Sequence, residues 1–315
     1  MTSPFPTRPF RFGVQLGSTT GRSHWVDQAR RVEDLGYSVA CLPDHFTEQL
    51  APVPALHSIL ENTTTLRAGA LVFDNDYKHP VVLAKEMATM DVLSEGRVEI
   101  GLGAGWMVSD YEQTGMPYDR AGVRIDRFEE GLAVIKGCLA SGPFSFEGEH
   151  YTINGYDGLP LPVQQPRPPI VIGGGGRRVL SIAAREADIV GVNGTLHAGV
   201  IGPEAVETMA LEAVAEKVAV VAGAAGDRLA DIEMNIRTFF TTVTDDRAGA
   251  VAAIAGMIPV DDDVIADSPF SLIGSIDKIV EDLLARRERF GFSYVIVGSD
   301  VLEAFAPVVG RLAGK

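Results

Sequence analysis

The chain has 315 residues, with 27 lysines and arginines against 42 aspartates and glutamates, which gives a formal net charge of −15. This acidity argues against nonspecific binding to nucleic acid or to an anionic membrane surface. No apolar run approaches the length of a membrane span, the first nine residues lack the apolar core of a signal peptide, and there are only two cysteines. We therefore expect a cytoplasmic protein that acts on a small molecule and needs neither a disulfide framework nor a structural metal.

Short apolar runs alternate with amphipathic segments along the whole chain. We expect strands at residues 10–16, 38–42, 66–72, 98–102, 170–172, 188–192, 233–243 and 294–298. Helices are expected at residues 23–35, 54–60, 80–93, 120–139, 177–186, 204–222, 245–257, 275–290 and 302–312, with an acidic loop at 259–269.

This alternation predicts a parallel sheet with right-handed crossovers, because short apolar strands are typical of sheets buried on both faces. Eight such units favour a (β/α)8 TIM barrel formed by a single domain over residues 1–315. An open, doubly wound sheet is the alternative. An insertion after strand 4, at about residues 106–168, interrupts the rhythm and is expected to contain a hairpin across Gly148.

Four consecutive glycines, residues 173–176, separate the fifth expected strand from a helix that begins near Arg177. Without Cβ atoms, the turn lets the backbone approach a ligand closely, and the helix directs free N–H groups and its positive dipole end at the same spot. This combination suits a phosphate. A flexible loop is the alternative interpretation.

Other unusual residues follow the second and fourth strands, where a TIM barrel places its active site. His45 could hydrogen-bond a cofactor or exchange a proton near neutral pH, or it could be a satisfied core residue. Its neighbour Asp44 could fix the histidine tautomer or cap the next helix. The run from Gly103 to Trp106 forms a second glycine-rich turn, in which the tryptophan lines a pocket or packs in the core. The sequence contains no His-Glu-x-x-His zinc motif, Gly-x-Ser-x-Gly elbow or Walker lysine.

Taken together, these features are similar to those of the bacterial luciferase-like monooxygenase superfamily, and most similar to its branch that uses the deazaflavin coenzyme F420. The order and spacing of several motifs carry the resemblance over nearly the whole chain. They are residues 12–16 (FGVQL), 43–46 (PDHF), 78–82 (KHPVV), 88–97 (ATMDVLSEGR), 101–106 (GLGAGW), 168–176 (PPIVIGGGG) and 272–275 (LIGS).

The resemblance implies an isoalloxazine-type ring in the barrel mouth and a homodimer. It implies a catalytic His45 beside the ring and a non-proline cis peptide behind it, at Ala70–Leu71. The cofactor-binding residues that it implies are Asp44, Ala70, Leu71, Gly103, Ala104, Gly105, Trp106, Gly174, Gly175, Gly176 and Arg177. Backbone N–H groups near Gly174–Arg177 and around Gly103–Gly105 are implied to hold the cofactor phosphate.

One position departs from the pattern. Sugar-phosphate dehydrogenases of this branch carry an acid where this chain has Trp106, so the resemblance implies an apolar or aromatic substrate instead. The leading hypothesis is therefore hydride transfer between F420 and a small organic molecule. The alternatives are an FMN-dependent monooxygenase, a flavin- or deazaflavin-binding protein with little catalysis, and a sugar-phosphate lyase or isomerase that would bind phosphate near strands seven and eight.

Overall fold

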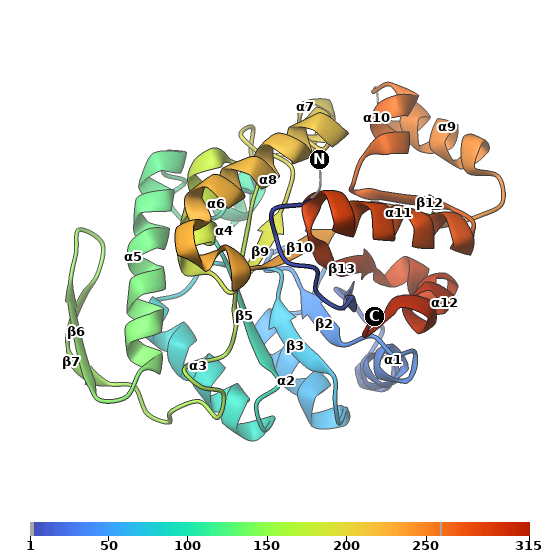
Figure 1. The fold of residues 1–315 in the computed structure, drawn as a ribbon. Coiled ribbons are helices and arrows are strands. Elements are labelled where there is room, and N and C mark those ends of the chain that lie inside the picture. Colours follow the sequence, from blue (N-terminus) through green and yellow to red (C-terminus); the bar gives the residue numbers. More distant parts are fainter. Residues whose placement is uncertain (1–2, 259) are drawn as a thin grey trace.

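The structure is a computed structural model that describes residues 3–258 and 260–315, and its centre is a closed parallel barrel (Figure 1). The barrel strands are β1 (Arg11–Gln15), β2 (Val39–Leu42), β3 (Arg67–Ala70), β5 (Val98–Gly103), β8 (Ile170–Gly174), β9 (Ile189–Val192), β10 (Glu233–Arg237) and β13 (Phe292–Gly298). Neighbouring strands pair in this order, and the pairs β3–β5 and β1–β13 close the ring. The predicted TIM barrel is confirmed.

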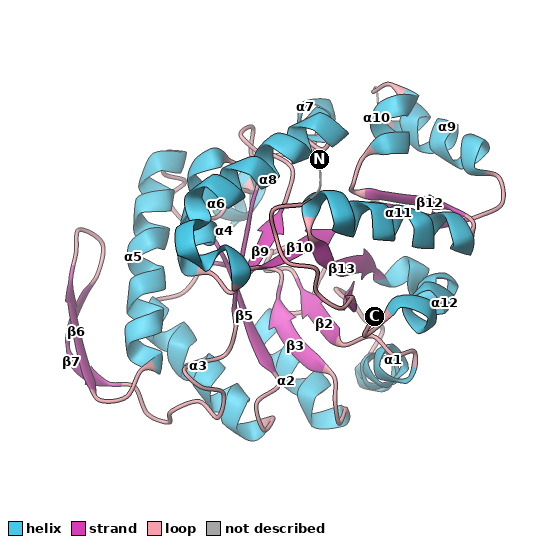
Figure 2. Ribbon diagram, viewed as in Figure 1, coloured by secondary structure: helices cyan, strands magenta, loops and turns pink. Residues whose placement is uncertain are grey.

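Helices surround the barrel on the outside (Figure 2). They are α1 (Arg22–Asp34), α2 (Pro52–Asn62), α3 (Pro80–Leu93), α4 (Val108–Thr114), α5 (Ala121–Leu139), α6 (Arg177–Glu186), α7 (Pro203–Glu207), α8 (Leu211–Ala225), α9 (Arg247–Met257), α10 (Asp262–Asp267), α11 (Ile276–Phe290) and α12 (Leu302–Leu312). Short 3-10 turns follow α8 at Gly226–Ala230 and β13 at Ser299–Val301. No helix within the described residues is long and apolar enough to cross a bilayer.

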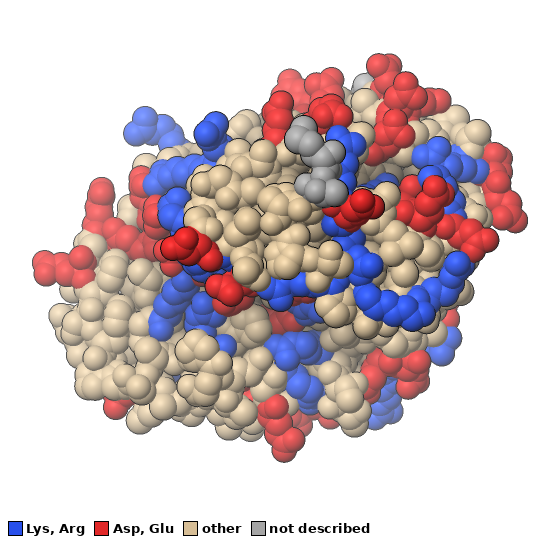
Figure 3. All heavy atoms as spheres, in the orientation of Figure 1, with Lys and Arg blue, Asp and Glu red and all other residues tan. Residues whose placement is uncertain are grey.

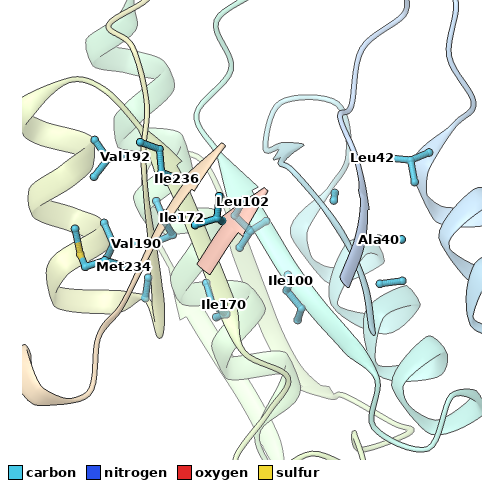
Figure 4. Packing of buried hydrophobic residues seen from close by; sticks show 14 of the residues in the cluster. Ala40, Leu42, Ile100, Leu102, Ile170, Ile172, Val190, Val192, Met234 and Ile236 are labelled. Atoms are coloured by element: carbon cyan, nitrogen blue, oxygen red, sulfur yellow. The ribbon is translucent and has the colours of Figure 1, made fainter. Parts of the chain in front are cut away.

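The hydrophobic core has two layers because side chains alternate along each strand. On β2, Ala40 and Leu42 pack outward in the large cluster that the strands share with the helices (Figure 4). Val39 and Cys41 point the other way, into a small cluster inside the barrel that includes Tyr294. The inner cluster fills the barrel, so a ligand that enters the barrel mouth has to lie above this cluster, at the strand ends.

Charged side chains close the N-terminal end of the barrel. Buried Glu99 at the start of β5 accepts from Arg11 Nη1 at 2.5 Å and from Arg67 Nε at 3.0 Å. Arg11 also donates to Glu233 at 2.7 Å, and its guanidinium lies 3.7 Å from the ring centroid of Tyr294. Each of these charges therefore has an opposite partner.

The prediction of one strand at residues 233–243 is wrong, because these residues form two strands. β10 ends at Arg237, and β11 (Phe240–Val243) pairs with β12 (Ser271–Gly274) in a small parallel sheet outside the barrel. The chain is drawn away because Phe239 N and Phe240 N both donate to Phe270 O.

Two other expectations are corrected. The helix expected at 204–222 consists of α7 and α8, and the acidic loop expected at 259–269 contains α10, although residue 259 lies outside the described residues. In the second segment, Asp262 and Asp263 lie in the first turn of α10, where acidic side chains stabilise a helix.

The insertion after β5 contains α4, α5 and a two-stranded antiparallel hairpin of β6 (Pro143–Glu147) and β7 (Thr152–Asp157). The expected hairpin is confirmed, whereas α4 was not expected. The hairpin stands at one edge of the molecule, beside α5 (Figure 1). Acidic and basic side chains are interspersed over the face seen in Figure 3.

Candidate functional site

A cavity of about 540 Å³ opens at the C-terminal ends of the barrel strands. Most of the residues predicted for the cofactor line it, namely Asp44, His45, Leu71, Gly103, Ala104, Gly105, Trp106, Gly174, Gly175 and Gly176. Two do not. Ala70 is buried inside β3, and Arg177 points to solvent from the first turn of α6. Neither side chain reaches the cavity, and a contact of either residue with the cofactor through its backbone stays a prediction.

A backbone bulge forms one wall of the cavity at the end of β3. Its non-proline cis peptide joins Leu71 to Val72, so the predicted position at Ala70–Leu71 is wrong by one bond. The reason lies in strand pairing, since Leu71 N still donates to Leu42 O as a strand residue. The ladder breaks only after Leu71 and resumes at β4 (Phe73–Asp74), which pairs with the end of β5.

Glycines in β5 make room for this bulge. A Cβ atom at Gly101 would lie 1.9 Å from Ala70 O, and one at Gly103 would lie 2.7 Å from Val72 Cγ2. A side chain at either position would push the bulge into the cavity. These glycines therefore allow the close approach that shapes the wall.

His45 is held by an acid from the insertion. Its Nδ1 lies 2.6 Å from Asp110 Oδ2, and the same carboxylate accepts from Tyr77 Oη at 2.9 Å and from Phe46 N at 3.1 Å. Asp110 is buried in the first turn of α4, and Trp106 packs edge-on against the imidazole with centroids 5.4 Å apart. Because the Asp110 carboxylate accepts hydrogen bonds from its other neighbours, it also favours a proton on His45 Nδ1. Nε2 is then the ring nitrogen left to exchange a proton with a ligand.

Sequence reasoning missed Asp110 and offered Asp44 for the tautomer role. Asp44 instead accepts from Asp74 N at 3.3 Å, and burial raises the pKa of its carboxyl group. In the sequence, Asp110 is a single acid in a short polar segment, 65 residues after His45. Only the fold brings the two together.

A second acid, Asp74, lies in the cavity wall and forms no ion pair with any of the described residues. Burial raises its pKa to about 7, and the negative charge of Asp76 adds to this effect, although Asp76 N donates to the Asp74 carboxylate. Tyr111 Oη donates to Asp74 Oδ2 at 3.0 Å. A Cβ atom at Gly105, where φ is +73°, would lie 2.0 Å from that hydroxyl oxygen. Glycine is required there for conformation and for space.

The four-glycine turn faces the same cavity. A Cβ atom at Gly175 would lie 2.1 Å from Gly194 O, so the two turns touch through their backbones. Thr195 Oγ1 donates to Gly175 O at 3.1 Å and fixes this contact. Helix α6 begins directly after the turn, and its first N–H groups have no partner inside the helix.

A buried cation, Arg124 of α5, lies beside these turns. The residue is 6% exposed and lines the cavity, and its guanidinium donates to the carbonyl groups of Asp119 and Gly105. Within the described residues, Arg124 Nε has no hydrogen-bond partner and no carboxylate forms an ion pair with this guanidinium. A positive charge left in this way fits an anionic group of a ligand. Across residues 3–258 and 260–315 there is no cluster of three or more metal-ligating side chains.

Comparison with known proteins gives one family. The model for luciferase-like monooxygenases matches residues 7–268. An FMNH2-dependent dimethylsulfone monooxygenase of Pseudomonas putida is 28% identical over 199 residues, which cover 60% of this chain and 54% of that protein. An F420-dependent glucose-6-phosphate dehydrogenase of Amycolatopsis mediterranei is 29% identical over 177 residues, which cover 52% and 51%. The chain thus spans about half the length of these curated relatives.

Solved structures share the whole fold. The coenzyme F420-dependent tetrahydromethanopterin reductase from Methanopyrus kandleri superimposes with a TM-score of 0.75 at 22% identity, covering 97% of this chain and 98% of that one. A long-chain alkane monooxygenase gives a TM-score of 0.77 at 14% identity, covering 98% and 92%. The relatives include proteins named for F420 and for FMN.

Proposed function

We propose that the cavity binds coenzyme F420 and supports hydride transfer to or from a small organic molecule. The premise is that the chain belongs to the luciferase-like monooxygenase family. The organic molecule would have an apolar or aromatic body, because Trp106, Leu71 and Val72 contribute to the cavity wall. The observation that carries the proposal is the hydrogen-bonded pair of His45 and Asp110, which faces the same cavity as two glycine turns.

The residues present fit a phosphorylated, flat cofactor. Gly174, Gly175, Gly176 and the start of α6 would hold a phosphate with backbone N–H groups. Arg124, which forms no ion pair with the described residues, would add a positive charge. The turn from Gly103 to Gly105 would let a flat ring approach the bulge at Leu71–Val72. When bound, the deazaflavin ring would supply the hydride acceptor or donor.

His45 would move the proton that accompanies this chemistry. Asp110 keeps the imidazole oriented and favours a proton on Nδ1, so Nε2 can accept a proton from a substrate hydroxyl group or return one to a carbonyl group. Tyr77 donates to the same carboxylate and holds it in place. Trp106 covers one edge of the imidazole and limits the access of water.

Binding and turnover test this proposal separately. Titration of the purified protein with F420 and with FMN, followed by fluorescence, should show tighter binding of F420. The variant His45→Asn should keep F420 affinity within about threefold and lose at least about 100-fold in turnover. Tight FMN binding without F420 binding would sink the proposal.

The second candidate is an FMN-dependent monooxygenase, because a curated relative is named for reduced FMN and the same turns suit the phosphate of FMN. Oxygen consumption with reduced FMN and a set of small organic substrates distinguishes this activity. If either cofactor binds but no substrate is turned over, the protein is a binding protein with little catalysis. The homodimer expected from the resemblance stays a prediction, which light scattering can check.

A further inference from the structure

Arg237 is a cation in the cavity wall that the proposed chemistry does not use. It is the last residue of β10, it is half-buried, and it lines the cavity together with Gln15 and Asn235. Its Nε donates to Gln15 Oε1 at 2.9 Å, and Nη1 donates to Thr238 O. Its guanidinium also lies 4.6 Å from the ring centroid of Phe239, another lining residue.

The guanidinium has no ion-pair partner in the part of the chain that the structure describes. Asp300, an exposed residue of the turn after β13, is the carboxylate whose charge acts on it, without coming within ion-pair distance. Burial lowers the pKa of Arg237, while the charge of Asp300 opposes that change. Arginine stays protonated in proteins at neutral pH, so this is a positive charge that faces a largely apolar cavity.

Two hydrogen-bond donors at Arg237 and Gln15 also lack acceptors among the described residues. No acceptor among the described residues bonds to Arg237 Nη2 or to the amide nitrogen of Gln15, whereas Gln15 Oε1 is taken by Arg237. A planar guanidinium edge beside an amide N–H group matches the two oxygens of a carboxylate. The cost of an unpaired, half-buried charge is offset when such an anion binds.

The position of Arg237 separates it from the expected cofactor phosphate. In the ring of barrel strands, β10 lies four places from β3, directly across the mouth from the bulge at Leu71–Val72. The glycine turns and Arg124 follow β5 and β8, on the bulge side. A flat ring against the bulge would therefore leave the space in front of Arg237 to a second molecule.

We propose that Arg237 and Gln15 form an anion-binding subsite, and that the substrate carries a carboxylate group on an apolar or aromatic body. This inference rests on the proposed function for its statement that the second molecule is the substrate. The apolar walls would hold the body of the molecule, while Arg237 would fix the end that does not react. The carboxylate would thereby set which carbon atom is presented to the ring and to His45.

The probes for the test are benzoate and benzamide, which have nearly the same shape and differ in charge. Their dissociation constants are measured by calorimetry with protein saturated with oxidised F420 and with cofactor-free protein. Wild-type protein should bind benzoate at least about tenfold more tightly than benzamide, as expected for a hydrogen-bonded ion pair in a cavity. Arg237→Gln should abolish the difference, and Arg237→Lys should retain part of it.

Arg22→Gln is the matched control. Arg22 begins α1 at the same end of the barrel, is exposed and lies outside the cavity, so its replacement removes the same charge without touching the subsite. This variant should keep the wild-type preference for benzoate. A preference that depends on net charge alone would fall equally in both glutamine variants, and that result would overturn the proposal.

Two other outcomes overturn it. One is equal binding of benzoate and benzamide by the wild type. The other is a weaker F420 affinity in Arg237→Gln with an unchanged benzoate preference, which would assign Arg237 to the cofactor. If wild-type protein binds no F420 but still prefers benzoate through Arg237, the anion subsite is supported and the proposed function alone fails.

Discussion

At the N-terminal end of the barrel, Glu99 lies between Arg11 and Arg67, and Arg11 also reaches Glu233. At the C-terminal mouth, Asp74, Arg124 and Arg237 lie in a cavity wall without ion pairs among the described residues. Both ends hold ionisable groups in partly or fully buried positions, but these three groups at the mouth lack the opposite charges that Glu99, Arg11 and Arg67 give one another. In TIM barrels the N-terminal end serves stability and the mouth serves chemistry. In this barrel, the charges at the N-terminal end are paired with one another, whereas several at the mouth are left for a ligand.

The largest effect on stability is expected from Glu99→Gln. Burial opposes ionisation of Glu99, but Arg11 and Arg67 hold its pKa below the ordinary value, so the variant leaves two guanidinium groups with one negative charge fewer. The free energy of unfolding should fall by about 3–5 kcal/mol, as measured by urea denaturation. Glu303→Gln breaks only the exposed pair with Arg31 and should lower the free energy of unfolding far less. Similar losses in both variants would contradict the comparison.

At the mouth, Asp110→Asn should reduce activity and not folding. The neutral amide no longer selects the proton position on His45, so kcat should fall by about 100-fold while KM and F420 affinity change by less than about threefold. Tyr77→Phe should cost less, because it removes one donor to Asp110 and leaves the histidine contact intact. An equal fall of stability and kcat would show that Asp110 acts only as a structural residue.

Asp74→Asn sharpens the comparison through pH. The folded-state pKa of about 7 lies above the ordinary value of 3.8, so between these values the folded state holds a proton that the unfolded chain has lost. The free energy of unfolding should therefore fall by about 1–3 kcal/mol as pH rises from about 4 to 7. The variant should lack this contribution, whereas exposed Asp277→Asn should retain it. Parallel stability–pH curves for wild type and Asp74→Asn would refute the assignment.

A smaller effect than at Glu99 or Asp74 is expected from Glu33→Gln at the N-terminal end. Burial opposes ionisation of Glu33, but the backbone N–H groups of Thr65, Leu66 and Thr64 lower its pKa to about 2. Its contribution to stability is therefore present above the ordinary pKa of 4.5 and is lost as pH falls towards 2. The variant should lose about 1–2 kcal/mol at pH 7. Denaturation at pH 3 should show a smaller difference between the two proteins, and a constant difference would argue against this account.

The sequence was sufficient for elements whose signals are local. Residues 80–93, 177–186 and 302–312 were expected as helices and form α3, α6 and α12, because apolar spacing and boundary residues such as Pro80 define them. Residues 233–243 were expected as one strand because β-branched and aromatic residues continue to Val243. The partner of β11, namely β12, lies some 30 residues away and leaves no local signal.

The site divides in the same way. The glycine turns and His45 were found because their residue types are unusual and follow strands. Asp110 and Arg237 were missed because an isolated acid and an isolated arginine acquire meaning only from what lies across the cavity. The cis bond was misplaced by one residue because strand pairing, which ends after Leu71, decides its position.

The pairing of β1 with β13 has a consequence for biosynthesis. β1 ends at Gln15 and β13 begins at Phe292, so the ribosome must add nearly the whole chain before the ring can close. At ordinary rates of translation this takes on the order of 15–60 s, during which one edge of β1 has no partner. An unpaired apolar edge invites association between nascent chains. We therefore expect chaperones that cover this edge to improve the yield of native protein more than any change at the mouth would.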